Sequence, residues 1–223
     1  MDDLIADLHI HSKYSHDSLM SPEGVVKQAK KAGLTCIAIT DHDTIRGGVE
    51  GKKAGEKYGI RVIAGSEIKT DCGDIIGLNL HDEIRVTGWK EVIAAIRSQG
   101  GLVVLPHPYR EHTHVEEIAP LVDFIETGNG RSTPEQNAAA ASLAVRAGKP
   151  QTYGSDAHIL SEIGAVQVRI DPVSYQCREI LKFRLAAEDE IRRSRITSLV
   201  KQKKFGTLIT QGAHRLGKKL WRP

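Results

Sequence analysis

The chain has 223 residues, enough for one α/β domain with a substantial core, and 40% of its residues are hydrophobic. It has no run of 18 apolar residues, which argues against a membrane span, and its acidic start is unlike a secretory signal. Three cysteines without a Cys-x-x-Cys pair predict a reduced, cytoplasmic protein. The net charge of +3 is unevenly distributed, since residues 1–181 carry −6 and residues 182–223 carry +9.

Short apolar runs alternate with segments of helical periodicity along the chain. The apolar runs predict strands at Leu4–His9, Thr35–Thr40, Arg61–Ala64, Leu102–Leu105, Leu121–Ile125, Gln151–Tyr153 and Ala165–Ile170. Between them, helices are predicted at Ser21–Ala32, Gly47–Tyr58, Trp89–Gln99 and Thr133–Ala147. An extra strand at Gly73–Leu80 is expected to pair with the strand at Arg61–Ala64. Such alternation favours a parallel sheet or barrel.

Polar residues that can bind metals follow the ends of these strands. His9 and His11 close the first strand, and the two-residue period of a strand places both imidazoles on one side. Imidazole is the commonest metal ligand in proteins, and the carboxyl ends of parallel strands form the rim where active sites lie. The sequence therefore predicts one cluster, made of His9, His11, His42, Glu67, His107, Glu126, Asp156 and His158.

Five histidines with several carboxylates exceed the coordination of one tetrahedral ion. This donor set, with no cysteine pair beside it, favours a site of several Zn, Mn or Fe ions over a structural zinc. Adjacent divalent ions can share a hydroxide as nucleophile and neutralise a phosphoryl group. The chain has no Gly-x-Ser-x-Gly elbow, Walker loop or dinucleotide fingerprint, so hydrolysis of a phosphoester is the reaction that the cluster favours.

Several of these motifs occur together and in the order found in the PHP superfamily, named for polymerase and histidinol phosphatase. They are His9-Ile10-His11, Ser15–Pro22, Thr40–Asp43, Glu67, Pro106-His107-Pro108, Glu126 with Asn129-Gly130, and Ser155–His158. The chain resembles this family over roughly residues 4–170. The resemblance implies a distorted (β/α)7 TIM-like barrel over residues 1–180, with a trinuclear metal centre at its C-terminal face. A C-terminal helix and basic tail would follow over residues 181–223.

The resemblance also implies how the candidate ligands divide among three ions. One ion would be held by His9, His11, Glu67 and Asp156. Glu67 would bridge to a second ion, held also by His107 and Glu126. The third would be held by His42, His158 and one member of the His16–Asp17 pair. Spacing from Ser21 favours Asp17 and spacing from His11 favours His16, so both remain candidates.

Catalytic roles are predicted for residues around this centre. Asp156, His158 and His42 are candidates for protonating the leaving oxygen, and Arg110 and Arg131 for gripping a phosphate. The alternative for the cluster is a set of satisfied buried polar groups, and Glu126 could be a positioning carboxylate only. Asp41 is expected to orient His42. Ordinary surface positions are predicted for the remaining histidines, which are His81, His112, His114 and His214.

The C-terminal part carries a different pattern. Ile180, Phe183, Ala187 and Ile191 recur at helical spacing and predict a helix packed on the barrel. Basic clusters with one aromatic follow, at Lys201–Lys204, Lys218-Lys219 and Trp221-Arg222. A solvated tail is the favoured interpretation, and contact with nucleic acid phosphates is the alternative.

The sequence thus predicts a metal-dependent phosphoesterase that uses a metal-bridged hydroxide. By resemblance, its substrates are phosphomonoesters or nucleotide and short oligonucleotide phosphoesters, and no membrane partner is expected. One alternative is a nucleic-acid-binding protein that uses the basic tail, with the barrel as a scaffold. Another is hydrolysis of C–N bonds at the same centre, because one barrel can support related chemistries.

Overall fold

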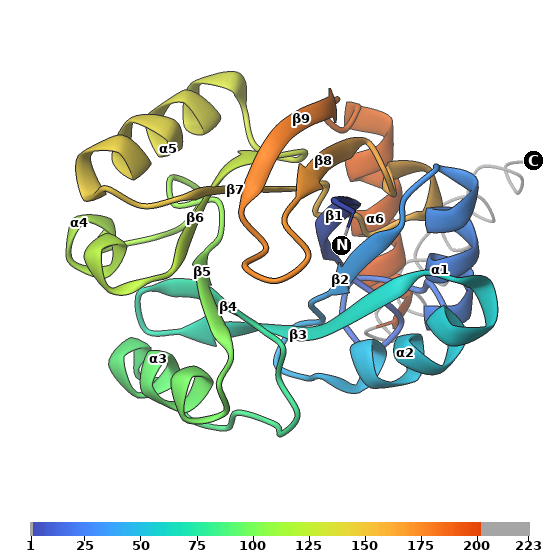
Figure 1. Cartoon of the computed structure of the whole chain (residues 1–223), viewed down its shortest axis with the longest axis horizontal. Helices are drawn as coiled ribbons and strands as arrows, with labels where there is room; N and C mark the ends of the chain where they lie inside the picture. The colour runs from blue at the N-terminus through green and yellow to red at the C-terminus, as the bar shows by residue number, and fades with distance from the viewer. Residues whose placement is uncertain (1, 202–223) are drawn as a thin grey trace, which may run out of the picture.

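The computed structural model describes residues 2–201, except the side chains of residues 196, 199 and 200. Its sheet has nine strands in the order β7-β6-β5-β4-β3-β2-β1-β8-β9 (Figure 1). The strands are β1 Leu4–Ile10, β2 Cys36–Ile39, β3 Arg61–Thr70, β4 Gly73–Leu78, β5 Leu102–Leu105, β6 Phe124–Asn129, β7 Gln151–Gly154, β8 Val166–Ile170 and β9 Cys177–Phe183.

The first seven strands form a nearly closed barrel. Strands β1, β2 and β3 are parallel, β4 is antiparallel to both of its neighbours, and β5, β6 and β7 are again parallel. Strand β7 then approaches β1, where the backbone N–H of His11 donates to the carbonyl of Ala157 at 2.9 Å. A Cβ at Gly154 would lie 2.3 Å from the Cβ of His9, so glycine permits this close approach.

Helices cover the outside of the barrel (Figure 1). They are α1 Pro22–Lys31, α2 Arg46–Tyr58, α3 Trp89–Ser98, α4 Val115–Ile118, α5 Pro134–Ala147 and α6 Glu188–Lys201, with short 3-10 turns at Ala119–Leu121 and Leu160–Glu162. Local sequence explains their ends, because the hydroxyl of Ser21 accepts the N–H of Gly24 and Thr133 forms a capping box with Gln136. No helix within residues 2–201 is long and apolar enough to cross a membrane.

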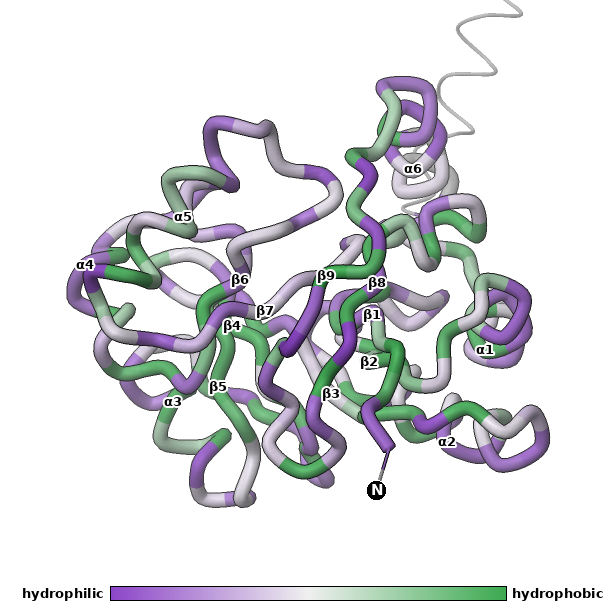
Figure 2. The backbone as a smooth tube through the Cα atoms, turned by 45° about the horizontal axis from the view of Figure 1, so that its top comes forward, coloured by the Kyte–Doolittle hydropathy of each residue, from purple (hydrophilic) through white to green (hydrophobic). Residues whose placement is uncertain are grey.

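Apolar residues fill the barrel and both of its flanks. The interior cluster takes side chains from β1 to β6, including Ala6, Leu8, Ile76 and Phe124. Two outer clusters lie beneath α1 and α2 and beneath α3 to α5. Figure 2 shows the same arrangement, with hydrophobic segments concentrated in the central strands. Burial of these residues leaves the polar candidates at one end of the barrel.

An irregularity in β1 sets the direction of the two histidines. Leu4, Ala6 and Leu8 belong to the interior cluster, whereas Ile10 belongs to an outer cluster. The alternation therefore reverses where the register of β1 against β2 shifts, between Asp7 and Ile10. Because of this reversal, His9 and His11 lie above the apolar interior instead of facing the helices.

Two predictions about the strands need correction. The late strand, β8, is antiparallel to β1, so its carboxyl end does not join the rim, and β4 supplies the seventh barrel strand instead. The strand predicted at Arg61–Ala64 continues to Thr70, and β4 pairs with this continuation. The barrel itself, a TIM-like fold with a C-terminal extension, is confirmed.

The helix predicted through Ile180 and Phe183 was wrong. Residues Cys177–Phe183 form strand β9, which pairs with β8, and α6 begins only at Glu188. The turn at Asp171 folds the chain back on β8, since its carboxylate accepts the N–H groups of Val173 and Ser174. Backbone pairing to this edge strand thus overrides the helical spacing. Strand β9 also crosses the predicted boundary between residues 180 and 181.

Candidate metal centre

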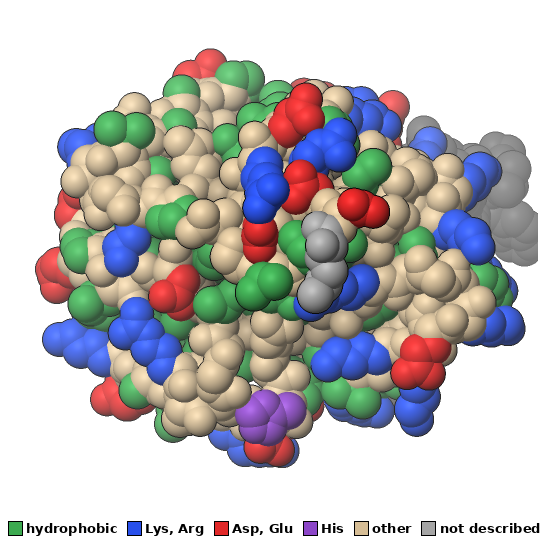
Figure 3. All heavy atoms as spheres, in the orientation of Figure 1, with side chains coloured by type: hydrophobic (Ala, Val, Ile, Leu, Met, Phe, Trp, Pro, Cys, Tyr) green, Lys and Arg blue, Asp and Glu red, His purple; other side chains and the backbone are tan. Residues whose placement is uncertain are grey.

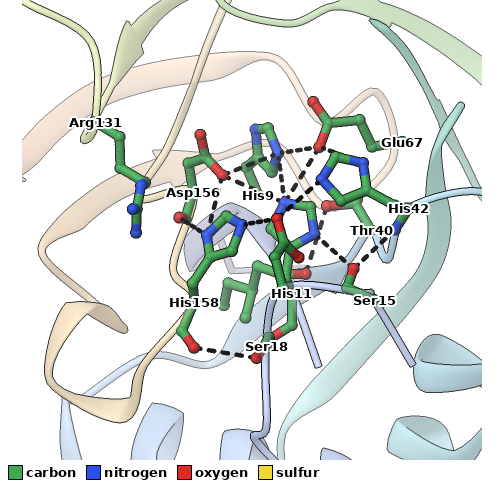
Figure 4. Close-up of polar contacts among 12 residues, drawn as sticks. His9, His11, Ser15, Ser18, Thr40, His42, Glu67, Arg131, Asp156 and His158 are labelled. Atoms are coloured by element: carbon green, nitrogen blue, oxygen red, sulfur yellow. Dashed lines mark hydrogen bonds and ion pairs between the residues drawn. The ribbon is translucent and has the colours of Figure 1, made fainter. Parts of the chain in front are cut away.

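Seven side chains converge above the barrel interior, and Figure 4 shows most of them pointing toward one another. His9 comes from β1 and His11 directly follows it, Glu67 comes from β3, and His42 from the loop after β2. His107, Asp156 and His158 come from the loops after β5 and β7. All are buried except His42, which is half-buried. On the face drawn in Figure 3, histidine shows only near one edge, so the centre does not open on that face.

The carboxylate of Glu67 lies at the middle of the cluster. Its Oε2 is 3.2 Å from the Nε2 atoms of both His9 and His11, and its Oε1 is 2.8 Å from Nε2 of His107. The Nε2 atoms of His9 and His11 are themselves 3.1 Å apart, and Oδ1 of Asp156 is 3.3 Å from that of His11. Glu67 therefore faces two groups of donors, as a bridging ligand must.

A second group surrounds Asp17, in the loop between β1 and α1. Its Oδ2 lies 2.8 Å from Nε2 of His158 and 3.4 Å from Nε2 of His42. His16 is 59% exposed in its side chain, and its Nε2 is 3.9 Å from the same oxygen. The geometry thus favours Asp17 over its neighbour as a ligand.

The arrangement fits divalent ions. Four sets of three or four donors have ligand atoms within 4.8 Å of one another. The sets are His11, Asp17, His42 and His158; His9, His11 and Glu67; His9, His107 and Asp156; and Glu67, Asp74 and His107. Within residues 2–201, Oδ1 of Asp17 and Nδ1 of His107 are buried without a hydrogen-bond partner. Such unsatisfied polar atoms are costly unless something else binds them.

The electrostatics of the protein's own groups agree with this. Burial favours the neutral form of Glu67, but nearby His9 and His42 hold its pKa well below the usual range. For His11, burial favours the neutral imidazole and so lowers the pKa, yet hydrogen bonds to Asp156 and Glu67 raise the pKa to about 10. The pKa of His107 and of His158 is lowered by burial. Without ions, the centre therefore holds charged carboxylates with protons on some imidazoles.

Backbone strain is concentrated at two of the candidate ligands. His107 and Asp156 have positive φ angles of 26° and 55°, a region that residues other than glycine seldom adopt. Such conformations persist where the surroundings impose them, and they are concentrated at functional sites. Both residues follow a strand end, so the strained turn directs each side chain back over the barrel.

Glu126 acts on the ligands and does not join any of the four donor sets. Its Oε1 lies 3.0 Å from Nδ1 of His9, and its Oε2 accepts the backbone N–H of His107 at 3.0 Å. Asn129, which the sequence analysis named only as part of the motif that follows Glu126, donates to Oε2 of Glu126 at 3.0 Å. These contacts favour the positioning role for Glu126, since an orienting partner fixes which ring nitrogen of His9 is free.

Arg110 is paired with a candidate ligand. Its Nη2 donates to Oδ2 of Asp156 at 2.5 Å and its Nη1 to Oδ1 of Asn129 at 3.2 Å. Burial opposes its charge, but the coulombic attraction of Asp156 raises the pKa of Arg110. The guanidinium therefore lies in the cleft while it also fixes the orientation of Asp156.

Asp41 does not contact the imidazole of His42, contrary to prediction. Its carboxylate accepts the N–H groups of Ser12 and Ser15 and the hydroxyl of Ser12. Ser15 in turn contacts Nδ1 of His11 at 2.9 Å and accepts the backbone N–H of His42 at 2.8 Å. Asp41 thus holds a turn whose serine positions two candidate ligands.

The guanidinium of Arg131 is already bound by other side chains of the protein. Its Nη1 donates to Oε1 of the buried Glu162 at 2.8 Å, and its Nη2 to the hydroxyl of Ser194 in α6 at 2.6 Å. At the end of α6, the ammonium of Lys201 donates to the carbonyls of Lys13, Ser15 and Ser18. Helix α6 is therefore fixed to two loops of the centre. The basic clusters beyond Lys201 lie outside the described residues, as does His214.

A cleft of about 290 Å³ opens onto the cluster. Asp74, the second residue of β4, lines it and belongs to one donor set, and the sequence analysis did not single it out. His112 is half-buried, and its ring nitrogens contact the carbonyls of Arg110 and Asp74, so its assignment to the surface was wrong. His81 and His114 are exposed, as predicted.

Comparison with models of known protein families shows which family the chain belongs to. The PHP domain model matches residues 7–142, and the PHP-associated model matches residues 134–182. The chain belongs to the PHP domain family. The resemblance inferred from the motifs is confirmed.

Individual proteins and solved structures are also similar to this PHP chain. An uncharacterized protein of Methanocaldococcus jannaschii is 49% identical over 115 residues, which are 47% of this chain and 67% of that protein. A 5′-3′ exoribonuclease of Haemophilus influenzae is 42% identical over 77 residues, 33% of this chain and 28% of the enzyme. A solved structure from Bifidobacterium adolescentis, described as a metal-dependent phosphoesterase, superposes with a TM-score of 0.60 at 20% identity, covering 86% of this chain and 96% of that one, which shows the shared fold.

Proposed function

We propose that this PHP protein hydrolyses phosphomonoesters or nucleotide and oligonucleotide phosphoesters, using up to three Zn, Mn or Fe ions. The observation that carries the proposal is the sharing of donors among the four sets in one cleft. His9 and His11 each belong to two sets, and Glu67 faces donors on both of its oxygens. Shared donors are typical of adjacent ions, and adjacent ions are suited to phosphoryl chemistry.

The ions would be held by donors of these four sets, which overlap because His9, His11, Glu67 and His107 each belong to two of them. When bound, they supply Lewis acidity toward a phosphoryl oxygen and lower the pKa of water. The chain's own residues fix the geometry: Glu126 holds His9, and Arg110 holds Asp156. The cationic edge of Arg110 at the cleft also favours an anionic group there.

Proton delivery to the leaving oxygen is the remaining step. Asp156 is unsuited to this role because Arg110 and the neighbouring imidazoles hold its pKa well below the usual range, against the effect of burial. Its carboxylate is therefore charged and has no proton to donate. His158 and His42 line the cleft near Asp17. An imidazole that holds an ion is a poor proton donor, so in this proposal either one delivers the proton only while it holds no ion, and water in the cleft is the other proton source.

The substrate class is supported by the relatives. The H. influenzae protein is by its description an exoribonuclease, and the stretch it shares with this chain covers 33% of the latter. A small phosphomonoester remains the second substrate class within the same reaction. The oligonucleotide would place a phosphodiester in the cleft, and the monoester would place its terminal phosphate there.

The test uses full-length, manganese-loaded protein with a short 5′-phosphorylated oligoribonucleotide, with product masses as readout. Release of mononucleotides would support a nuclease. Release of inorganic phosphate from an intact chain would support a phosphomonoesterase. His158→Ala is expected to lower both metal content and turnover, whereas His81→Ala, a change at an exposed histidine outside the cleft, is the matched control. If His158→Ala leaves both quantities unchanged, the proposal is wrong.

A further inference from the structure

Three cationic side chains line the cleft, and only one has no partner within residues 2–201. Arg110 pairs with Asp156 at 2.5 Å and Arg131 with Glu162 at 2.8 Å. Lys69 uses its backbone N–H to reach Asp43, but its ammonium makes no ion pair or hydrogen bond to the described part of the chain. Its charge is therefore available to a ligand, and the sequence analysis did not single it out.

Lys69 lies farther from the middle of the metal centre than Glu67 does. Lys69 lies two residues after Glu67 in β3, so the two side chains stand on the same face of the strand. Each residue of a strand advances about 3.3 Å, which places Lys69 about 7 Å farther along β3 than Glu67. An ammonium there is beyond the donor sets but still borders the cleft.

A second hollow continues from the cleft at this point. It has a volume of about 610 Å³ and shares Asp43 and Lys69 with the lining of the cleft. Its far side is the segment 84–87, which carries Arg85. Arg85 is exposed and has no side-chain partner within residues 2–201. We call this hollow, between Lys69 and Arg85, the side groove.

The side groove also contains two carboxylates, Asp43 and Asp71, and neither forms an ion pair with Lys69 or Arg85 within residues 2–201. Asp43 accepts the N–H of Lys69 and Asp71 accepts the N–H of Trp89, both at 3.0 Å, so each carboxylate already has a donor. Val86 is 43% exposed and provides an apolar wall. Two free cations beside an apolar wall suit a ligand that combines a phosphate with a flat organic group.

We propose that Lys69 and Arg85 form a second phosphate subsite, which holds the phosphate next to the reacting one in an oligonucleotide. This inference rests on the proposed function and narrows its substrate class to chains with at least two phosphates. A monoester with one phosphate would fill the cleft and leave the side groove empty. A 5′-phosphorylated dinucleotide would reach both.

The experiment compares AMP with the dinucleotide pApA on full-length, manganese-loaded protein. The readout is the ratio of the KM for pApA to the KM for AMP. A charge-assisted hydrogen bond at a partly exposed site corresponds to about tenfold in affinity, so Lys69→Ala and Arg85→Ala should each raise this ratio about tenfold. Lys69→Arg should keep the low ratio. Lys52→Ala, an exposed lysine of α2 outside both linings, is the control and should not change it.

Two outcomes would overturn the subsite: an unchanged ratio, or equal losses for both substrates, which would place Lys69 at the reacting phosphate. If the wild-type protein cleaves neither substrate, the proposed function fails, and calorimetric binding then decides the subsite separately. Tighter binding of pApA than of AMP, with the difference abolished by Lys69→Ala, would support it. Equal binding of the two ligands by the wild-type protein would refute it.

Discussion

Oε1 of Glu67 lies 2.8 Å from Nε2 of His107, while the other oxygen of the same carboxylate faces His9 and His11. This side chain of β3 thus connects the candidate ligands at the end of β1 with one in the loop after β5. Its place inside β3 fixes it more firmly than a loop would, because Ile76 of β4 pairs with it.

Glu67→Gln should therefore remove more than one ligand contact. The amide keeps the shape but loses the charge, so we expect metal affinity to fall about 100-fold or more, with turnover falling in parallel. Metal content after dialysis, measured by mass spectrometry, checks this. Glu56→Gln, at an exposed position of α2, should retain its metal. Full metal content in Glu67→Gln would contradict the bridging role.

The pairing of Arg110 with Asp156 predicts a milder effect. Arg110→Gln removes the charge that holds Asp156 in place, and loss of such an orienting partner typically costs about 10- to 100-fold in metal affinity or activity. Steady-state kinetics and metal titration of the variant provide the measurement. Arg146→Gln, which breaks an exposed pair with Glu116, is the control and should behave like the wild type.

Metal binding should release protons at pH 7. In the metal-free protein the pKa of His11 is raised to about 10 and that of His9 lies well above its usual value, so both imidazoles carry protons at neutral pH. An ion can bind only after they leave, and affinity should weaken about tenfold per pH unit for each proton as pH falls. Calorimetry in buffers of different ionisation enthalpy measures the release. A value of zero would mean that these imidazoles are already neutral.

Replacing Gly48 by alanine should destabilise the fold. A Cβ there would lie 2.5 Å from Cα of Ala64, where α2 packs on β3. Alanine normally favours a helix over glycine, but this clash with backbone should reverse the sign and destabilise the fold by about 1–3 kcal/mol. Denaturant unfolding of Gly48→Ala measures it, with Glu56→Ala as a control on the exposed side of α2. Equal or greater stability would show that α2 can move away.

The sequence was most informative where polar residues interrupt apolar runs. His9 lies near the end of a strand, and His107 and Asp156 lie two residues beyond one. Parallel strands bring such ends together whatever the details of packing. The strand bounds were less predictable. Residues 65–70 continue β3 because β4 pairs with them, and that partner comes from elsewhere in the chain.

Side-chain partners were the least predictable feature. Asp41 lies next to His42 in sequence, yet its carboxylate faces the turn at Ser12 and Ser15. Arg131 pairs with Glu162, which is far from it along the chain and carried no motif. Local spacing cannot specify such contacts, because they depend on how loops after different strands meet above the barrel.

The contact between β1 and the loop after β7 also bears on how the chain reaches its native state. The carboxylate of Asp7 accepts the N–H of Ser155, a contact between residues 148 positions apart. His9 and His11 are made early by the ribosome, but Asp156 and His158 join them only when most of the chain has emerged. Contacts of such long range slow folding, because the entropy of loop closure must be overcome first. The metal ions would then bind only after the barrel has closed. A chain truncated before residue 156 should bind them weakly, even though it retains His9 and His11.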